Sequence, residues 1–205
     1  MKKTVNINLG GRPFIIDEDA YKTLDNYLSS IERHFSKSEG FEDILYDIEA
    51  RIAELFEEND NTGQIITSKK IEEIKSTMGR PQDFGAEEYS EPNNKSTHSN
   101  RRLFRDPEDK VIGGVASGLT AYYGMKDTLL IRLLFVLFGL FSIGLIVYVV
   151  LWIAIPKAKT SSDFLAMRGE KINIENIAKT VEDGFMDLKN TFDELHNDFK
   201  SKIKN

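Results

Sequence analysis

The stretch that decides the fold is LLFVLFGLFSIGLIVYVVLWIAI, residues 133–155, in which 23 consecutive residues carry no charged side chain. A helix of this length is about 34 Å long at 1.5 Å per residue, enough to cross the hydrocarbon core of a bilayer. A soluble helix that is apolar on every face needs a large core around it, and a chain of 205 residues offers none of that size. Residues 133–155 therefore predict one transmembrane helix.

Two aromatic side chains and three small residues mark this segment. Tyr148 and Trp152 lie near its C-terminal end, where amphipathic rings favour the membrane interface. Gly139, Ser142 and Gly144 indicate a kink or a helix contact near the middle.

The orientation of the segment is not decided by charge, because basic residues flank both ends. They are Lys110, Lys126 and Arg132 before it and Lys157, Lys159, Arg168 and Lys171 after it. The first thirty residues contain no apolar run typical of a secretory signal, so we expect the N-terminal domain to be cytoplasmic and the membrane to be the cell inner membrane. A re-entrant hairpin that uses residues 111–125 is the alternative, and it would place both termini inside.

Composition limits the classes of function. A chain of 205 residues with 40% hydrophobic content and a net charge of -6 allows one or two small domains, and the absence of cysteine excludes disulfides and thiolate metal sites. The three histidines, His34, His98 and His196, are far apart in the sequence, so we expect no metal site. Residues 1–100 carry 12 Lys and Arg against 20 Asp and Glu, which disfavours direct nucleic-acid binding.

The glycine-rich run GGVASG, residues 113–118, does not have the pattern of a nucleotide site. Gly113 and Gly118 have the glycine spacing of a phosphate loop, but Leu119 stands where that loop requires lysine. The dinucleotide pattern GxGxxG does not occur. We therefore expect no cofactor here.

As a helix, residues 111–123 place small side chains on one narrow face, and Gly114 and Gly118 form GxxxG. Such a face lets another helix approach closely near the membrane; the alternative is a helix lying in the membrane interface. Arg132 is expected either to extend to the lipid headgroups or to pair with Asp127. The expected packing and interaction residues are Gly113, Gly114, Ser117, Gly118, Ala121 and Arg132.

Residues 101–158 resemble the PspC domain of phage shock protein C. The resemblance rests on the basic start RRL, the run VIGGVASGL followed by AYYG, Asp127 followed by LIRLLF, and the closing Tyr148, Leu151-Trp152 and Pro156. It implies an inner-membrane protein that takes part in envelope-stress signalling.

Before this domain the sequence predicts a small α+β domain at residues 1–89. Residues 4–16 alternate around Gly10-Gly11, as in a β-hairpin. Apolar side chains at helical spacing predict three amphipathic helices, one ending near Phe35 and the others at about 42–58 and 68–78, which we expect to form a bundle. A solvated helix face explains the acidic residues of the second helix better than paired catalytic acids do.

The segments FEDILYDIEARIAELFEE and IEEIKSTMGRPQDFG resemble the HAAS helical sensor domain, which occurs beside PadR-type transcription regulators. The resemblance covers residues 17–90 and implies a transcription regulator as one candidate partner. Residues 90–100, SEPNNKSTHSN, have the composition of a linker.

The tail, residues 159–205, contains a long amphipathic helix with apolar residues three or four positions apart. Three interpretations remain: a coiled coil with itself or a partner, packing on the N-terminal domain, and adsorption to the membrane surface. The expected interface residues are Phe185, Leu188, Phe192, Leu195 and Phe199.

The expected fold class is thus a mainly α membrane protein: a β-hairpin with a three-helix bundle, a transmembrane helix preceded by a short membrane-proximal helix, and a C-terminal amphipathic helix. Because no nucleophile, base or metal cluster is evident, we expect no enzyme, no catalytic residue and no small-molecule substrate. The expected function is that of a membrane-anchored stress-response protein that couples the cell envelope to a protein partner, with homo-oligomers as one form. The alternative is an accessory subunit of a membrane transport or enzyme complex.

Overall fold

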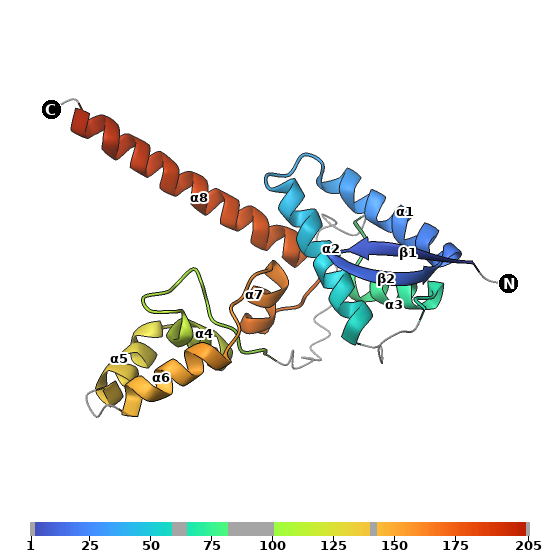
Figure 1. The fold of residues 1–205 in the computed structure, drawn as a ribbon. Helices are drawn as coiled ribbons and strands as arrows, with labels where there is room; N and C mark the ends of the chain where they lie inside the picture. The colour runs from blue at the N-terminus through green and yellow to red at the C-terminus, as the bar shows by residue number, and fades with distance from the viewer. Residues whose placement is uncertain (1–2, 59–64, 82–100, 140–142, 204–205) are drawn as a thin grey trace, which may run out of the picture. The chain divides into compact units, whose positions relative to one another are not determined.

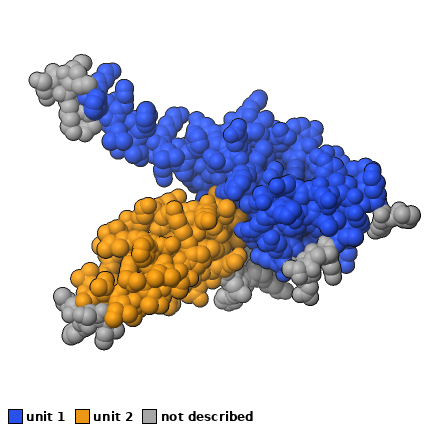
Figure 2. Space-filling model, viewed as in Figure 1, with its two compact units in different colours: residues 1–89, 173–205 blue, residues 90–172 orange. Residues whose placement is uncertain are grey.

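The structure, a computed structural model, describes residues 3–58, 65–81, 101–139 and 143–203. Contacts divide the chain into two compact units (Figures 1 and 2): unit 1 comprises residues 1–89 and 173–205, and unit 2 comprises residues 90–172. The chain therefore leaves unit 1, forms unit 2, and returns to unit 1 with its last helix. The predicted linker at 90–100 lies outside the described residues.

Unit 1 begins with the predicted β-hairpin. Strands β1 (Thr4–Leu9) and β2 (Arg12–Asp17) pair antiparallel, with Leu9 opposite Arg12. The two turn residues, Gly10 and Gly11, have φ values of 55° and 77°, the left-handed values that a two-residue hairpin turn requires. A Cβ on Gly10 would also lie 2.8 Å from the Cα of Ala50, so the turn packs against the backbone of the second helix.

The three predicted helices follow: α1 (Glu18–Phe35), α2 (Phe41–Glu58) and α3 (Ser68–Met78). They pack on one another and on the hairpin, and each buries the apolar face that its sequence spacing indicates. The fully buried core includes Ile16, Ile31, Ile44, Ile48, Ile52, Phe56, Ile71 and Met78.

Tyr27 is a buried polar side chain in this core. Its hydroxyl donates a hydrogen bond of 2.7 Å to the carbonyl of Gly79, directly after α3, and burial raises the pKa of the phenol above its usual value. The bond ties the middle of α1 to the end of α3.

The last helix of the chain, α8 (Ile174–Ile203), belongs to unit 1. Its first turns pack on α2 and bury Ile174, Ile177 and Ala178. Beyond these turns the helix projects away from the rest of unit 1 (Figure 1).

Unit 2 contains four helices among its described residues: α4 (Val115–Tyr123), α5 (Thr128–Gly139), α6 (Ile143–Ala154) and α7 (Ser161–Arg168). Helices α5 and α6 pack side by side as a helical hairpin, the α5–α6 hairpin (Figure 1). Phe104, Ala158, Ala166 and Met167 form a small core beside it.

The predicted transmembrane helix at residues 133–155 is wrong, and the fold class is corrected accordingly. The segment is divided between α5 and α6, each of 12 residues. Across the ranges that the structure describes, every helix is too short or too polar to span a bilayer. The protein is mainly helical, with one two-stranded sheet at its N-terminal end.

Two glycines account for the division. Helix α5 ends at Gly139, and glycine is among the weakest helix formers. Gly144, in the first turn of α6, is buried, and a Cβ there would overlap the backbone at Phe138. The absence of a side chain at Gly144 thus allows the start of α6 to pack directly against the end of α5.

Candidate functional site

The GxxxG glycines pack against a segment of the same unit. A Cβ on Gly114 would overlap the carbonyl oxygen of Asp106, and a Cβ on Gly118 would overlap that of Phe104. The amide of Asp106 donates a hydrogen bond of 3.0 Å to the carbonyl of Gly114. Gly114 also has φ = 74° and precedes α4 directly. The small face of α4 therefore receives the backbone of residues 104–106.

The other two small residues of this face are also inside unit 2. Ser117 is buried, and its hydroxyl donates a bond of 3.3 Å to the carbonyl of Gly114. Ala121 is partly buried against the core formed by Phe104 and its neighbours. The predicted helix at 111–123 begins only at Val115, so Ser117, Gly118 and Ala121 lie in α4, whereas Gly113 and Gly114 precede it with positive φ. The segment that packs on this face, residues 104–106, was not predicted from the sequence.

Gly113 and Trp152 meet where α6 ends. A Cβ on Gly113 would lie 2.6 Å from the indole nitrogen of Trp152. The guanidinium of Arg105 lies 5.8 Å from the centre of the indole ring and donates a bond of 2.9 Å from Nε to the carbonyl of Ile155. Trp152 is nevertheless about half exposed, so the ring contacts both the unit and its surroundings.

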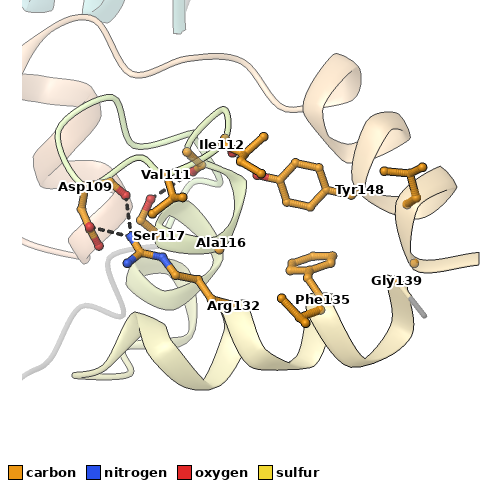
Figure 3. Close-up of a pocket in the computed structure, with 13 residues that line it drawn as sticks. Asp109, Val111, Ile112, Ala116, Ser117, Arg132, Phe135, Gly139 and Tyr148 are labelled. Carbon is orange, nitrogen blue, oxygen red and sulfur yellow. Dashed lines mark hydrogen bonds and ion pairs between the residues drawn. The ribbon is translucent and has the colours of Figure 1, made fainter. Parts of the chain in front are cut away.

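Arg132 is paired with Asp109 (Figure 3). Its Nη2 donates bonds of 2.6 Å to Oδ1 and 3.1 Å to the backbone carbonyl of Asp109. This hydrogen bond from Arg132 lowers the pKa of the Asp109 carboxyl, which also accepts from the Thr128 hydroxyl at 3.0 Å. Asp127, the partner considered from sequence, instead accepts from the amide of Leu129 at the start of α5.

Asp109 was not singled out from the sequence, because it lies 23 positions from its partner and in a turn. The turn that contains Asp109 does have a sequence signal, the aspartate at position 106. Asp106 Oδ1 accepts from the amides of Glu108 (2.9 Å) and Asp109 (3.4 Å), which is the side-chain turn that aspartate favours.

Tyr148 connects α6 to the residues before α4. Its hydroxyl donates a hydrogen bond to the carbonyl of Ile112, and its ring meets the ring of Phe135 edge to face at 5.0 Å between centres. In Figure 3 the Tyr148 side chain points from α6 toward Ile112 in the loop before α4, and the ring of Phe135 lies next to that of Tyr148.

The outer surface of the α5–α6 hairpin is apolar and exposed, and no side chain of α5 is buried. Exposed apolar patches of this kind mark a surface that meets a membrane or another protein. The exposed large apolar side chains are Leu129, Leu130, Leu133, Leu134, Val136, Leu137 and Phe138 on α5 and Leu145, Ile146, Val147, Val149, Val150, Trp152 and Ile153 on α6.

Of the expected interface residues of the tail, Phe185 lies beside Gly40 at the base of α8, and the other four lie farther along the helix. All five, Phe185, Leu188, Phe192, Leu195 and Phe199, are exposed, with Phe192 at 72% and Phe199 at 70%. At its base the helix is held by Val181 and Phe185 against Gly40 and by an ion pair of 3.3 Å between Lys189 and Glu39.

Metal-ligand side chains do not cluster in the described ranges. No three His, Asp or Glu side chains gather there as metal ligands would. That the protein is not an enzyme remains a prediction.

These features define unit 2 as a small helical domain that buries glycines internally and exposes an apolar helical hairpin. Residues 101–158 match the PspC domain family, so the chain contains a PspC domain. This domain indicates a stress-response role of the phage shock protein type, and PspC domains are typically membrane-associated. No curated protein and no solved structure matches the chain. The HAAS resemblance of the N-terminal residues is not confirmed and stays a prediction.

Proposed function

We propose that this protein is a stress-response interaction protein that attaches to the inner face of the cytoplasmic membrane through its PspC domain and binds a protein partner through unit 1. The observation that carries the proposal is the exposed apolar surface of the α5–α6 hairpin. A surface of this kind is costly in water at about 25 cal/mol per Å² of apolar area. A lipid environment removes that cost.

The dimensions of the hairpin suit one leaflet. Each of its helices has 12 residues, so each is about 18 Å long, against about 30 Å for the hydrocarbon core. The hairpin therefore embeds in one leaflet and does not cross the membrane.

Basic side chains at the end of the hairpin that is joined to the rest of unit 2 support the same placement. Lys126 precedes α5 and Lys157 follows α6. These cations lie near the ends of the helices that are joined to the rest of unit 2, where they can meet anionic headgroups. Trp152 lies in the last turn of α6, at the level that indole rings favour in a membrane interface.

The partner surface proposed is the exposed stripe of α8, formed by the five tail residues named above. Their spacing of three and four residues is that of a helix-pairing face. Lipid adsorption is less favoured, because the polar face of α8 mixes acidic and basic side chains. A helix of a regulatory protein is the proposed occupant, and a transcription regulator of the kind that accompanies HAAS domains is the candidate.

Vesicle flotation of the purified full chain tests membrane attachment. We expect it to float with vesicles of phosphatidylethanolamine and phosphatidylglycerol, and the double variant Leu133→Asn/Ile146→Asn to reduce the bound fraction at least about tenfold. Both side chains are about two-thirds exposed, so the fold should tolerate the changes. Tyr46→Asn, at an exposed position of unit 1, is the matched control and should float as the wild type does. Equal flotation of the double variant would contradict the proposal.

Cysteine crosslinking in native membranes tests the partner surface, and the chain has no cysteine of its own. Leu195→Cys on the stripe should give crosslinks to another protein, and Asn190→Cys, also exposed on α8, serves as the control on the polar side. Adding Phe192→Ser and Phe199→Ser should abolish the Leu195→Cys product. Crosslinks only between two copies would identify a homo-oligomer in place of the regulator, and unchanged crosslinks would exclude the stripe as an interface.

A further inference from the structure

Unit 2 contains a pocket of about 350 Å³ between the α5–α6 hairpin and residues 109–117 (Figure 3). This volume is within the range of small-molecule sites. Small residues of α4 and the turn before it, Gly114, Ala116 and Ser117, form part of the lining and leave the space open. The pocket lies entirely among described residues of one unit.

The shape of the pocket is elongated along α5. Arg132 lies at one end of the lining and Gly139 at the other, a distance of about 10 Å at 1.5 Å per residue. The side chains between these ends include Phe135, Val136 and Tyr148, so the wall along this length is apolar or aromatic. A linear hydrocarbon chain fits such a space better than a compact polar molecule does.

The Arg132 end of the pocket is polar. Both hydrogen bonds of Arg132 leave from Nη2, so Nε and Nη1 have no partner in the part of the chain that the structure describes. The side chain is 28% exposed, so these N–H groups are partly removed from water. The carboxylate of Asp109 balances the positive charge of Arg132. The remaining N–H groups of Arg132 therefore offer hydrogen-bond donors from a pair with little net charge.

Together these features specify a ligand with an apolar chain and an oxygen acceptor at one end. We propose that the pocket binds a single acyl chain, with its carboxylate or ester carbonyl oxygen accepting from Arg132 and its hydrocarbon lying along Phe135, Val136 and Tyr148. A free fatty acid and a phospholipid share this chemistry. Only the phospholipid form of the inference rests on the proposed membrane attachment.

The first arm of the test uses the full chain in vesicle-free buffer with a fluorescent medium-chain fatty acid, whose length matches the wall between Arg132 and Gly139. We expect saturable binding with one fatty acid per chain, and Val136→Trp should weaken it at least tenfold because the indole would occupy the pocket. Leu137→Trp is the matched control, since Leu137 is the next residue of the same helix, is similarly exposed and does not line the pocket. Arg132→Gln should weaken binding of the acid more than binding of the corresponding alkane.

The second arm uses phosphatidylglycerol vesicles that carry a photoreactive group on one acyl chain, with peptides mapped by mass spectrometry. Adducts within residues 132–148 that are lost in Val136→Trp and kept in Leu137→Trp support the phospholipid as ligand; binding in the first arm alone supports the free acid. Equal effects of both tryptophans in both arms would overturn the inference. Fatty-acid binding without flotation would contradict only the membrane proposal, and flotation without acyl binding or labelling would contradict only this one.

Discussion

The core of unit 1 and the α5–α6 hairpin of unit 2 use apolar side chains in opposite ways. In helices α1, α2 and α3 of unit 1, apolar side chains recur every three or four positions, and residues such as Ile48 and Phe56 are almost completely buried. In the hairpin nearly every position is apolar, and Leu133 and Ile146 remain about two-thirds exposed. High hydropathy here therefore marks a surface rather than a core. Folding removes the core side chains of unit 1 from water, whereas the side chains of the hairpin stay exposed after folding.

The largest expected difference is in the response to truncation of an apolar side chain. Phe56→Ala should reduce the free energy of unfolding of unit 1 by about 3–5 kcal/mol, because Phe56 is 1% exposed and its ring meets that of Phe14. Ile146→Ala should change the stability of unit 2 by less than about 0.5 kcal/mol.

Hydrogen–deuterium exchange during a urea titration measures the two units separately. If Ile146→Ala destabilised unit 2 as much as Phe56→Ala destabilises unit 1, the contrast between core and surface would be lost.

Replacing one glycine in each unit by alanine should change stability in opposite directions in the two units. Gly114→Ala should destabilise unit 2 by at least about 1–2 kcal/mol, because φ is 74° there and a methyl group meets the carbonyl of Asp106. Gly184→Ala, on α8 in unit 1, meets no atom and should stabilise that helix by up to about 1 kcal/mol. Urea midpoints by circular dichroism test both, and a neutral Gly114→Ala would refute the packing described for α4.

The smallest expected effect is the pH dependence of the Asp109–Arg132 pair. Because folding lowers the pKa of Asp109, the pair stabilises unit 2 above the unfolded pKa of about 3.9 and loses this contribution as the pH falls through the lower folded value. The pair is half exposed on the Asp109 side, so the contribution should be below about 1 kcal/mol.

Asp109→Asn should accordingly lower the urea midpoint of unit 2 slightly at pH 7 and have no further effect well below the folded pKa. Asp193→Asn, at an exposed position of α8, is the control. A stability difference that persists unchanged at the lowest pH would show that the carboxylate charge is not involved.

Much of the fold was predictable because its signals are local. The Gly10-Gly11 turn and the spacing of apolar residues in α1, α2 and α3 lie within a few residues of each other, and the hairpin and helices are present as predicted. Helix α7 was missed although it has a local signal: Thr160 and Asp163 form a reciprocal capping box at its start.

The division of residues 133–155 was not predicted, because hydropathy reports composition and not where a helix ends. Gly139 and Gly144 were noticed, but their effect depends on a contact between α6 and Phe138. The same limit applies to the candidate site. Arg132 stands out in the sequence as a charge beside an apolar segment. Its partner Asp109 does not, because the turn at 106–109 brings Asp109 to Arg132 only in the folded structure.

The return of the chain to unit 1 has a consequence for synthesis on the ribosome. The turns of α8 that bury Ile174, Ile177 and Ala178 follow the whole of unit 2 in the sequence, so unit 1 stays incomplete while residues 90–178 are made. At about 5–20 residues per second this interval is roughly 4–18 s. The apolar hairpin therefore leaves the ribosome, and can meet a membrane, before the α2 surface that α8 covers is closed. If the proposed membrane attachment occurs during synthesis, a nascent chain reaches the membrane while that α2 surface is still open to other proteins.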